Sequence, residues 1–174
     1  MQTPFVIGFV GHSGSGKTTL ATQVTRLLSQ QGISVAAIKN AHHGFDLDKP
    51  GKDTCRYREA GARQVMVRTE NRWALLVETE DVPPFEALLA HCAGVDLVLV
   101  EGFKNEGQFP KIEVRRRGAS EPHPRLWENN KDIVALVTND PLEKDRASAK
   151  GLSVLDLDDI AQVAEFILNR KASL

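Results

Sequence analysis

Apolar positions in this chain fall into short continuous runs and helical stripes that follow one another in order. The run FVIGFV at residues 5–10 predicts a strand buried on both faces. Leucine and valine then recur at i, i+4, i+7 and i+8 over residues 20–28, which predicts an amphipathic helix that Gly32 ends. The run ISVAAI at residues 33–38 predicts the next strand. Strand, helix and strand at this spacing predict a βαβ unit with a parallel strand pair.

The regular pattern stops after this unit. Glycine, proline, histidine and aspartate dominate residues 39–52, which predicts a long loop. A short helix follows, for which we predict Asp53 or Thr54 as the cap and Gly61 as the end.

The middle of the chain predicts a strand pair and a helix. Residues 64–68 and 73–77 have the composition of two adjacent strands, and residues 70–72 turn between them. Pro83 and Pro84 then open a helix with an apolar side.

The last part of the chain predicts further strands and a closing helix. Residues 95–100 predict a buried strand, residues 111–115 an edge strand with alternating charges, and residues 132–137 a final buried strand. The closing helix is predicted to be capped by one of three acidic residues, Asp156, Asp158 or Asp159. This alternation predicts an α/β fold, a three-layer sandwich around a mostly parallel sheet. Ligands of such sheets bind at the carboxyl ends of the strands.

Composition narrows the class of protein. The 174 residues are 41% hydrophobic and 26% charged, which suits a single globular domain spanning residues 1–174. The formal net charge of −1 gives no reason to expect nucleic acid or an anionic membrane as partner. No apolar stretch approaches the ~20 residues of a membrane span, and residues 1–4 lack the basic start of a signal peptide. Cys55 and Cys92 match no metal spacing, so we expect reduced thiols in a cytoplasmic protein.

The chemistry of the chain centres on residues 11–18, GHSGSGKT, which fit the pattern G-x-x-x-x-G-K-[ST] between a predicted strand and a predicted helix. Glycines allow backbone N–H groups to surround phosphate oxygens, and the helix N-terminus adds positive potential. Lys17 is expected to contact the β and γ phosphates, and Thr18 to bind Mg²⁺. The sequence thus predicts a single P-loop nucleotide-binding domain. Its phosphate contacts are predicted to be Ser13, Gly14, Ser15, Gly16, Lys17, Thr18 and Thr19. His12 occupies a variable position, where we expect it to point to solvent.

A carboxylate at the end of a neighbouring strand is expected near the metal or the attacking water. Asp96 and Glu101 flank the apolar strand, and five strand residues span roughly 16 Å, so only one of them can lie near the phosphates. Glu101 follows the carboxyl end and is therefore the predicted catalytic residue and metal ligand, together with Lys17 and Thr18. An ordinary solvated glutamate is the alternative.

Other strand ends give weaker signals. Lys39 follows a strand on the ligand side, as a phosphate contact or as a surface lysine. Asn139 and Asp140 follow the last predicted strand, where an aspartate could accept hydrogen bonds from guanine N1–H and N2–H₂. An Asn-Asp-Pro turn is the alternative, and the sequence leaves both open.

Several side chains outside these strand ends have two readings. His42, His43, Asp46 and Asp48 suit no standard zinc motif and indicate either a switch loop or a solvated loop. Asp53-Thr54 indicates a γ-phosphate sensor or a plain helix cap. Residues 115–117, three arginines, indicate an anion-binding segment or a solvated rim. Trp73 and Trp127 are interpreted as core and surface packing respectively.

Beyond the phosphate loop, the runs KNAHH at residues 39–43, DKPGKDT at 48–54 and VEGFK at 100–104 resemble the MobB family, in order and spacing, from about Val6 to Asp140. That family acts in biosynthesis of molybdopterin guanine dinucleotide. The resemblance implies a homodimeric GTP-binding protein with at most slow Mg²⁺-dependent GTPase activity. It also implies a MobA-type guanylyltransferase as partner, and it leaves open whether molybdopterin binds directly. Asn40 and Gly44 stand where histidine and aspartate are common.

The sequence and the resemblance together predict a nucleotide-dependent adaptor that binds GTP and Mg²⁺. The alternative from a different class is a P-loop small-molecule kinase that uses residues 115–117 as a phosphate lid. A kinase would turn over rapidly with its acceptor, whereas an adaptor would bind GTP and hydrolyse it slowly. An ATP-dependent synthetase or ligase is a weaker third reading, because no second substrate site is evident.

Overall fold

A computed structural model describes residues 3–41, 44, 48–118 and 123–173. Two compact units make up the chain, one formed by Met1–Asn40 with Leu88–Leu174 and the other by Ala41–Ala87. The predicted single domain over residues 1–174 stays a prediction.

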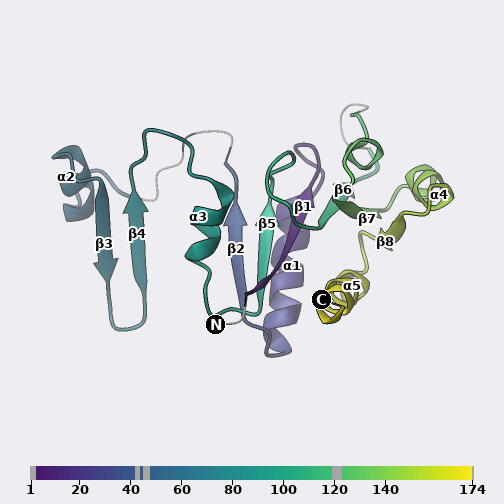
Figure 1. Ribbon diagram of the computed structural model, residues 1–174, viewed down its shortest axis with the longest axis horizontal. Helices are drawn as coiled ribbons and strands as arrows, with labels where there is room; N and C mark the ends of the chain where they lie inside the picture. The colour runs from purple at the N-terminus through teal and green to yellow at the C-terminus, as the bar shows by residue number, and fades with distance from the viewer. Residues whose placement is uncertain (1–2, 42–43, 45–47, 119–122, 174) are drawn as a thin grey trace. The chain divides into compact units, whose positions relative to one another are not determined.

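The larger unit is built on a six-stranded sheet with the order β2-β5-β1-β6-β7-β8 (Figure 1). Every neighbouring pair in this sheet is parallel. The strands are β1 Phe5–Val10, β2 Val35–Lys39, β5 Leu97–Glu101, β6 Lys111–Arg115, β7 Ile133–Thr138 and β8 Ser153–Asp156. The predicted α/β fold with a mostly parallel sheet is confirmed. All carboxyl ends of these strands meet at one edge of the sheet, which is where the site lies.

Helices α1 (Lys17–Gln30) and α5 (Ile160–Ala172) pack together against the sheet. The apolar stripe of α1 buries Leu20, Val24 and Leu28, and α5 buries its own apolar face in the same core. Asp159 caps α5, since its carboxylate accepts a hydrogen bond from Gln162 N at 2.9 Å. The other helices are α3 Phe85–Ala90, which crosses the boundary between the units, and α4 Pro141–Ala149, with a 3₁₀ turn at Leu126–Glu128. Within the described ranges, no helix has the length and hydropathy to cross a bilayer.

The prediction that residues 111–115 form an edge strand is wrong. β6 lies between β1 and β7, and its charged side chains are buried. Lys111 is 1% exposed and pairs with Asp132 at 3.0 Å, while Glu113 is 0% exposed and pairs with Arg115 at 3.0 Å. The alternation of charged and apolar residues thus reflects buried, compensated charges, a pattern that a sequence cannot distinguish from a solvated face.

The strand at 132–137 is also not the final one, because α4 and β8 follow it. Neither has a clear sequence signal. α4 buries only Glu143 and Ala147, so it lacks an apolar stripe, and β8 has only four residues. Both elements are stabilised by the sheet they join rather than by their own pattern.

The smaller unit contains α2 (Asp53–Glu59) and the antiparallel hairpin of β3 (Gln64–Arg68) and β4 (Trp73–Val77), which confirms both predicted strands. The predicted cap of α2 is wrong, because Lys52 occupies the cap position without a side-chain bond. Thr54 instead donates its hydroxyl to Asp48 at 2.7 Å. Trp73, interpreted as a core residue, is 61% exposed.

Candidate nucleotide-binding site

The loop at residues 11–16 joins the carboxyl end of β1 to the first turn of α1. The backbone geometry explains why glycine occupies two of its positions. A Cβ at Gly11 would lie 2.5 Å from the Val114 carbonyl oxygen, so no larger residue fits there. Gly16 has φ 93° and precedes α1 without a side-chain cap. Gly16 has no side chain that could accept a hydrogen bond from the first N–H groups of α1. These donors can therefore bind an anion at the start of the helix.

Lys17 closes the loop on itself. Its ammonium donates to the His12 carbonyl oxygen at 2.7 Å, which holds the cation beside the loop. Burial lowers the pKa of Lys17 below its ordinary value, and the charge of Glu101 opposes this shift. Lys104 and Lys39 lower the pKa further by repulsion. A polyanion such as a triphosphate would relieve this repulsion at Lys17.

The other predicted loop residues lie on or beside this turn. Ser13, Gly14, Thr18 and Thr19 are exposed, while Ser15 is buried and its hydroxyl makes no hydrogen bond to any described residue. The expectation that His12 points to solvent is wrong. Its ring stacks on His123 with centroids 4.1 Å apart, and its Nε2 lies 3.1 Å from the Pro124 carbonyl oxygen. His12 thereby ties the loop to residues 123–124.

A polar cluster lies where β2, β5 and α1 meet. Thr18 donates its hydroxyl to Glu101 Oε1 at 2.7 Å, and Lys39 Nζ lies 3.1 Å from the same oxygen and 3.2 Å from Thr18 Oγ1. Gly102, with φ 95°, turns the chain directly after Glu101 and donates its N–H to the Phe9 carbonyl oxygen at 3.1 Å. The structure thus brings together three predicted site residues from separate elements.

Asp96 lies at the opposite end of β5, as the strand length requires. Its Oδ2 accepts from Ser34 N at 2.9 Å and from Ser34 Oγ at 2.6 Å. These hydrogen bonds hold the pKa of Asp96 below its ordinary value. Asp96 therefore fixes the far end of the strand and has no place in the site.

The donor set of the polar cluster fits Mg²⁺. A hydroxyl and a carboxylate are hard oxygen ligands, and Thr18 Oγ1 and Glu101 Oε1 lie close enough to face one ion. The Lys39 ammonium already contacts both oxygens, which shows that the position accepts a cation. In the described part of the chain, no group of three or more histidine, cysteine or acidic residues forms a separate metal site.

Most of the candidate residues of the histidine loop cannot be assigned to the site. His42, His43 and Asp46 lie outside the described residues. Asp48 is described and serves the smaller unit, where it accepts from Thr54 and pairs with Arg58 Nε at 3.8 Å.

Asn139 and Asp140 follow β7 on the ligand edge, but both side chains have local partners. Asn139 Oδ1 accepts from Arg117 N at 2.9 Å. Asp140 caps α4 by accepting from Leu142 N at 3.0 Å, which supports the alternative reading as a turn residue. The guanine contact at Asp140 stays a prediction.

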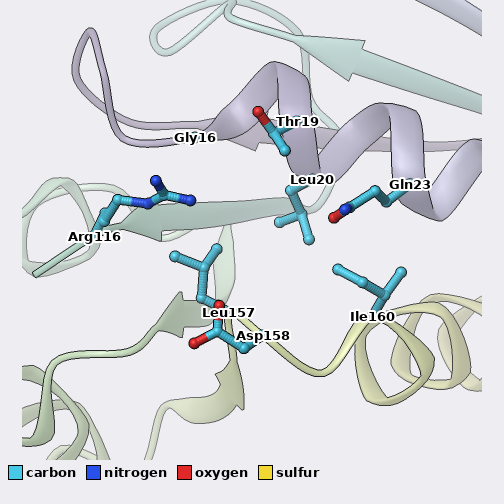
Figure 2. A pocket seen from close by; sticks show the side chains of 8 residues that line it. All are labelled: Gly16, Thr19, Leu20, Gln23, Arg116, Leu157, Asp158 and Ile160. Atoms are coloured by element: carbon cyan, nitrogen blue, oxygen red, sulfur yellow. The ribbon is translucent and has the colours of Figure 1, made fainter.

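The three arginines at 115–117 separate in the structure. Arg115 is held by Glu113 at 3.0 Å and Glu143 at 3.3 Å, whereas Arg116 reaches toward Gly16. Arg116 lines a hollow together with Leu157, Asp158 and other side chains (Figure 2). Sequence reasoning missed this hollow because it missed β8, whose carboxyl end carries Leu157 and Asp158.

A family model described as "Molybdopterin guanine dinucleotide synthesis protein B", or MobB, matches residues 6–139. The chain belongs to the MobB family. A relative from Haemophilus influenzae, "Molybdopterin-guanine dinucleotide biosynthesis adapter protein", is 40% identical over 94% of this chain and 88% of its own length. The Escherichia coli protein of the same description is 36% identical over 94% of this chain and 91% of its own.

Solved MobB structures agree with this assignment. The crystal structure of Bacillus subtilis MobB superposes with a TM-score of 0.71 at 25% identity, covering 95% of this chain and 96% of that one. The matched range of the MobB family model includes the loop, Lys39 and Glu101.

Proposed function

We propose that this MobB-family protein is a GTP-binding adaptor of molybdopterin guanine dinucleotide biosynthesis with slow Mg²⁺-dependent GTPase activity. The observation that carries the proposal is the convergence of Lys17, Thr18, Lys39 and Glu101 beside one glycine loop. The relatives described as adapter proteins of this biosynthesis support the pathway.

The chain's own residues account for phosphate binding. The turn at 13–16 and the start of α1 supply N–H donors, and Thr19 continues them in the first helical turn. Lys17 would exchange its bond to the His12 carbonyl oxygen for the β and γ phosphates, and Lys39 would neutralise the terminal phosphate from the β2 side. Lys17 gains from the exchange, because the carbonyl oxygen that it now contacts is neutral, whereas Lys39 already pairs with the Glu101 carboxylate and would gain the phosphate as a second anionic partner.

The same cluster explains why hydrolysis is proposed to be slow. Thr18 and Glu101 would hold Mg²⁺, which neutralises charge on the phosphates when bound. Glu101 Oε1 is shared with Thr18 and Lys39 and therefore orients ligands rather than acting as an unengaged base. A site that binds strongly and reacts slowly is suited to signalling the bound state to a partner enzyme.

The proposed partner is a MobA-type guanylyltransferase in the cytoplasm, with neither a nucleic acid nor a membrane involved. An adaptor implies an enzyme to which it binds, and guanine dinucleotide synthesis requires a transferase that consumes GTP. Direct binding of molybdopterin would place a second ligand on the same complex.

We also propose a homodimer formed through one face of the hairpin. Paired residues share a face, so Met66, Trp73 and Val77 lie on the same side of β3 and β4. Their exposed fractions are 67%, 61% and 44%. A two-stranded hairpin is marginally stable in water, and an apolar face of this kind favours a partner surface. A second copy of this chain would supply the same face and cover it symmetrically.

The kinase alternative loses one of its three proposed lid arginines. A phosphate lid needs mobile arginines, but Arg115 is bound to Glu113, Glu143 and the carbonyl oxygens of His123 and Pro124. Rapid phosphate transfer to a small acceptor would still favour the kinase over the adaptor.

Calorimetric titrations of GTP and ATP, each with and without Mg²⁺, test the proposal. We expect GTP to bind with Mg²⁺ at least about 10-fold more tightly than ATP, because only guanine offers two adjacent donors. Equal affinities for both nucleotides would overturn the assignment of GTP, and absence of binding to either would overturn nucleotide binding altogether.

A further inference from the structure

A hollow of about 170 Å³ lies beside the phosphate loop. Figure 2 shows Leu20 and Gln23 entering it from α1, Leu157 and Ile160 from the other side, and Arg116 reaching in toward Gly16. It is lined by Gly16, Thr19, Leu20, Gln23, Arg116, Leu157, Asp158 and Ile160. Its volume is below the ~300–1,000 Å³ of pockets for drug-sized ligands, so it suits one part of a nucleotide.

The position of the hollow relative to the phosphate loop indicates which part of the nucleotide it would bind. Thr18, Lys39 and Glu101 mark the metal end of the site on the β2–β5 side of the sheet. The hollow lies on the opposite side of β1, since Arg116 follows β6 and Asp158 follows β8. A triphosphate with its terminal group at Glu101 and its chain around the loop directs its ribose and base away from β5. We propose that this hollow binds the purine base of GTP and that Asp158 reads the guanine edge, an inference that rests on the proposed GTP binding.

The lining has the chemistry of a base pocket. Ile160 offers partly exposed apolar surface for one face of a flat ring, while Leu20 and Leu157, 2% and 5% exposed, close the bottom of the hollow. The Arg116 guanidinium, 3.6–3.8 Å from where a Cβ at Gly16 would lie, is planar and can stack on a base while its charge faces the phosphates. Because Arg115 is held by Glu113 and Glu143, Arg116 is the arginine of this segment that serves the hollow.

Asp158 is available because its neighbours perform the structural tasks. Asp156 fixes the turn after β8, accepting from Asp158 N at 2.9 Å and pairing with Lys144 at 2.7 Å. Asp159 caps α5. The exposed Asp158 carboxylate makes no hydrogen bond or ion pair with any other described side chain or backbone group, whereas Asp140 uses its Oδ1 to cap α4. A free carboxylate at the rim of this hollow can accept from guanine N1–H and N2–H₂ together.

Titrations of GTP and XTP into wild type, Asp158→Asn and Asp140→Asn test this proposal. Asparagine turns one acceptor oxygen into an NH₂ donor, which opposes guanine N2–H₂ and suits the carbonyl of xanthine. We expect Asp158→Asn to lose GTP affinity by about 10- to 100-fold and to gain XTP affinity, and Asp140→Asn tests the competing prediction that guanine is read at the end of β7. Asp158→Ala should lose GTP affinity without gaining XTP.

The outcomes separate this inference from the function on which it rests. Wild-type ranking of GTP over XTP in Asp158→Asn would overturn the role of Asp158, and a switch in Asp140→Asn instead would assign the base to the β7 end. Inorganic tripolyphosphate should bind wild type and Asp158→Asn equally, because the phosphate contacts are unchanged; a loss in the variant would also count against a role confined to the base. A wild type that binds neither GTP nor tripolyphosphate would contradict the proposed function itself.

Discussion

The two units of this chain use their apolar residues in opposite ways. The larger unit buries most of its large apolar side chains in one core, and its sheet carries the cluster of Thr18, Lys39 and Glu101 at the carboxyl edge. The smaller unit exposes Met66, Trp73 and Val77 on a two-stranded hairpin. In the proposed function, nucleotide binding and assembly therefore belong to separate parts of the chain, so variants should affect one without the other.

The largest effect is expected at Lys17. Lys17→Ala removes the cation that the loop holds against the phosphates, and we expect GTP affinity to fall at least about 10²-fold. The oligomeric state should not change, since the hairpin is untouched. Calorimetry with light scattering on the same samples measures both, and Lys131→Ala, at an exposed lysine away from the loop, is the control. Wild-type GTP affinity in the folded variant would show that this loop is not the phosphate-binding site.

Glu101→Gln should separate binding from hydrolysis within the larger unit. The amide keeps the shape of the side chain but loses the negative charge that orients Mg²⁺ and water, so the single-turnover rate should fall about 10²-fold with affinity nearly retained. Glu106→Gln, a nearby exposed glutamate, should leave the rate unchanged. An unaltered rate in Glu101→Gln would make Glu101 a structural partner of Lys39 only.

The hairpin offers the converse experiment. Met66→Ser combined with Trp73→Ser removes apolar area from the proposed dimer face, and we expect the dimer dissociation constant to rise about 10-fold or more. GTP affinity should stay at the wild-type value. Sedimentation velocity over a concentration series measures the change, with Val67→Ser on the opposite face of the hairpin as the matched control. A double variant that dimerises as well as wild type would move the interface elsewhere.

The smallest effect concerns His12, which connects the loop to His123. Burial lowers the pKa of His12 below 6.5, so the folded state disfavours the protonated ring. The unfolded chain takes up this proton first, and stability is therefore lost as the pH falls below 6.5 toward the lower folded value. Between pH 7.5 and 5.5 this should lower the melting temperature by at most about 2 °C.

His12→Gln should reduce that decrease, while His91→Gln, at an exposed position, should not. Equal pH dependence in all three proteins, followed by differential scanning calorimetry, would show that the stacked pair carries no pH sensitivity.

The sequence predicted the elements with a strong pattern and missed those that depend on their neighbours. β1 is a continuous apolar run, α1 has an apolar stripe of helical period, β3 and β4 have strand-like composition, and Glu101 followed from strand length alone. β6 was misplaced at the edge because Lys111 and Glu113 are compensated by Asp132 and Arg115, residues that a local pattern cannot include. Asp158 was missed as a site residue because three nearby aspartates are equivalent in sequence and differ only in which hydrogen bonds the fold gives them.

The adaptor proposal is tested most directly by capture of a MobA-type guanylyltransferase on the immobilised protein. Four conditions suffice: wild type with GTP and Mg²⁺, wild type without nucleotide, Lys17→Ala with GTP and Mg²⁺, and the Met66→Ser, Trp73→Ser variant with GTP and Mg²⁺. If nucleotide binding controls the partner, the first condition should capture at least about 10-fold more enzyme than the second and third. Equal capture by wild type with and without GTP, and by Lys17→Ala, would contradict a nucleotide-dependent adaptor.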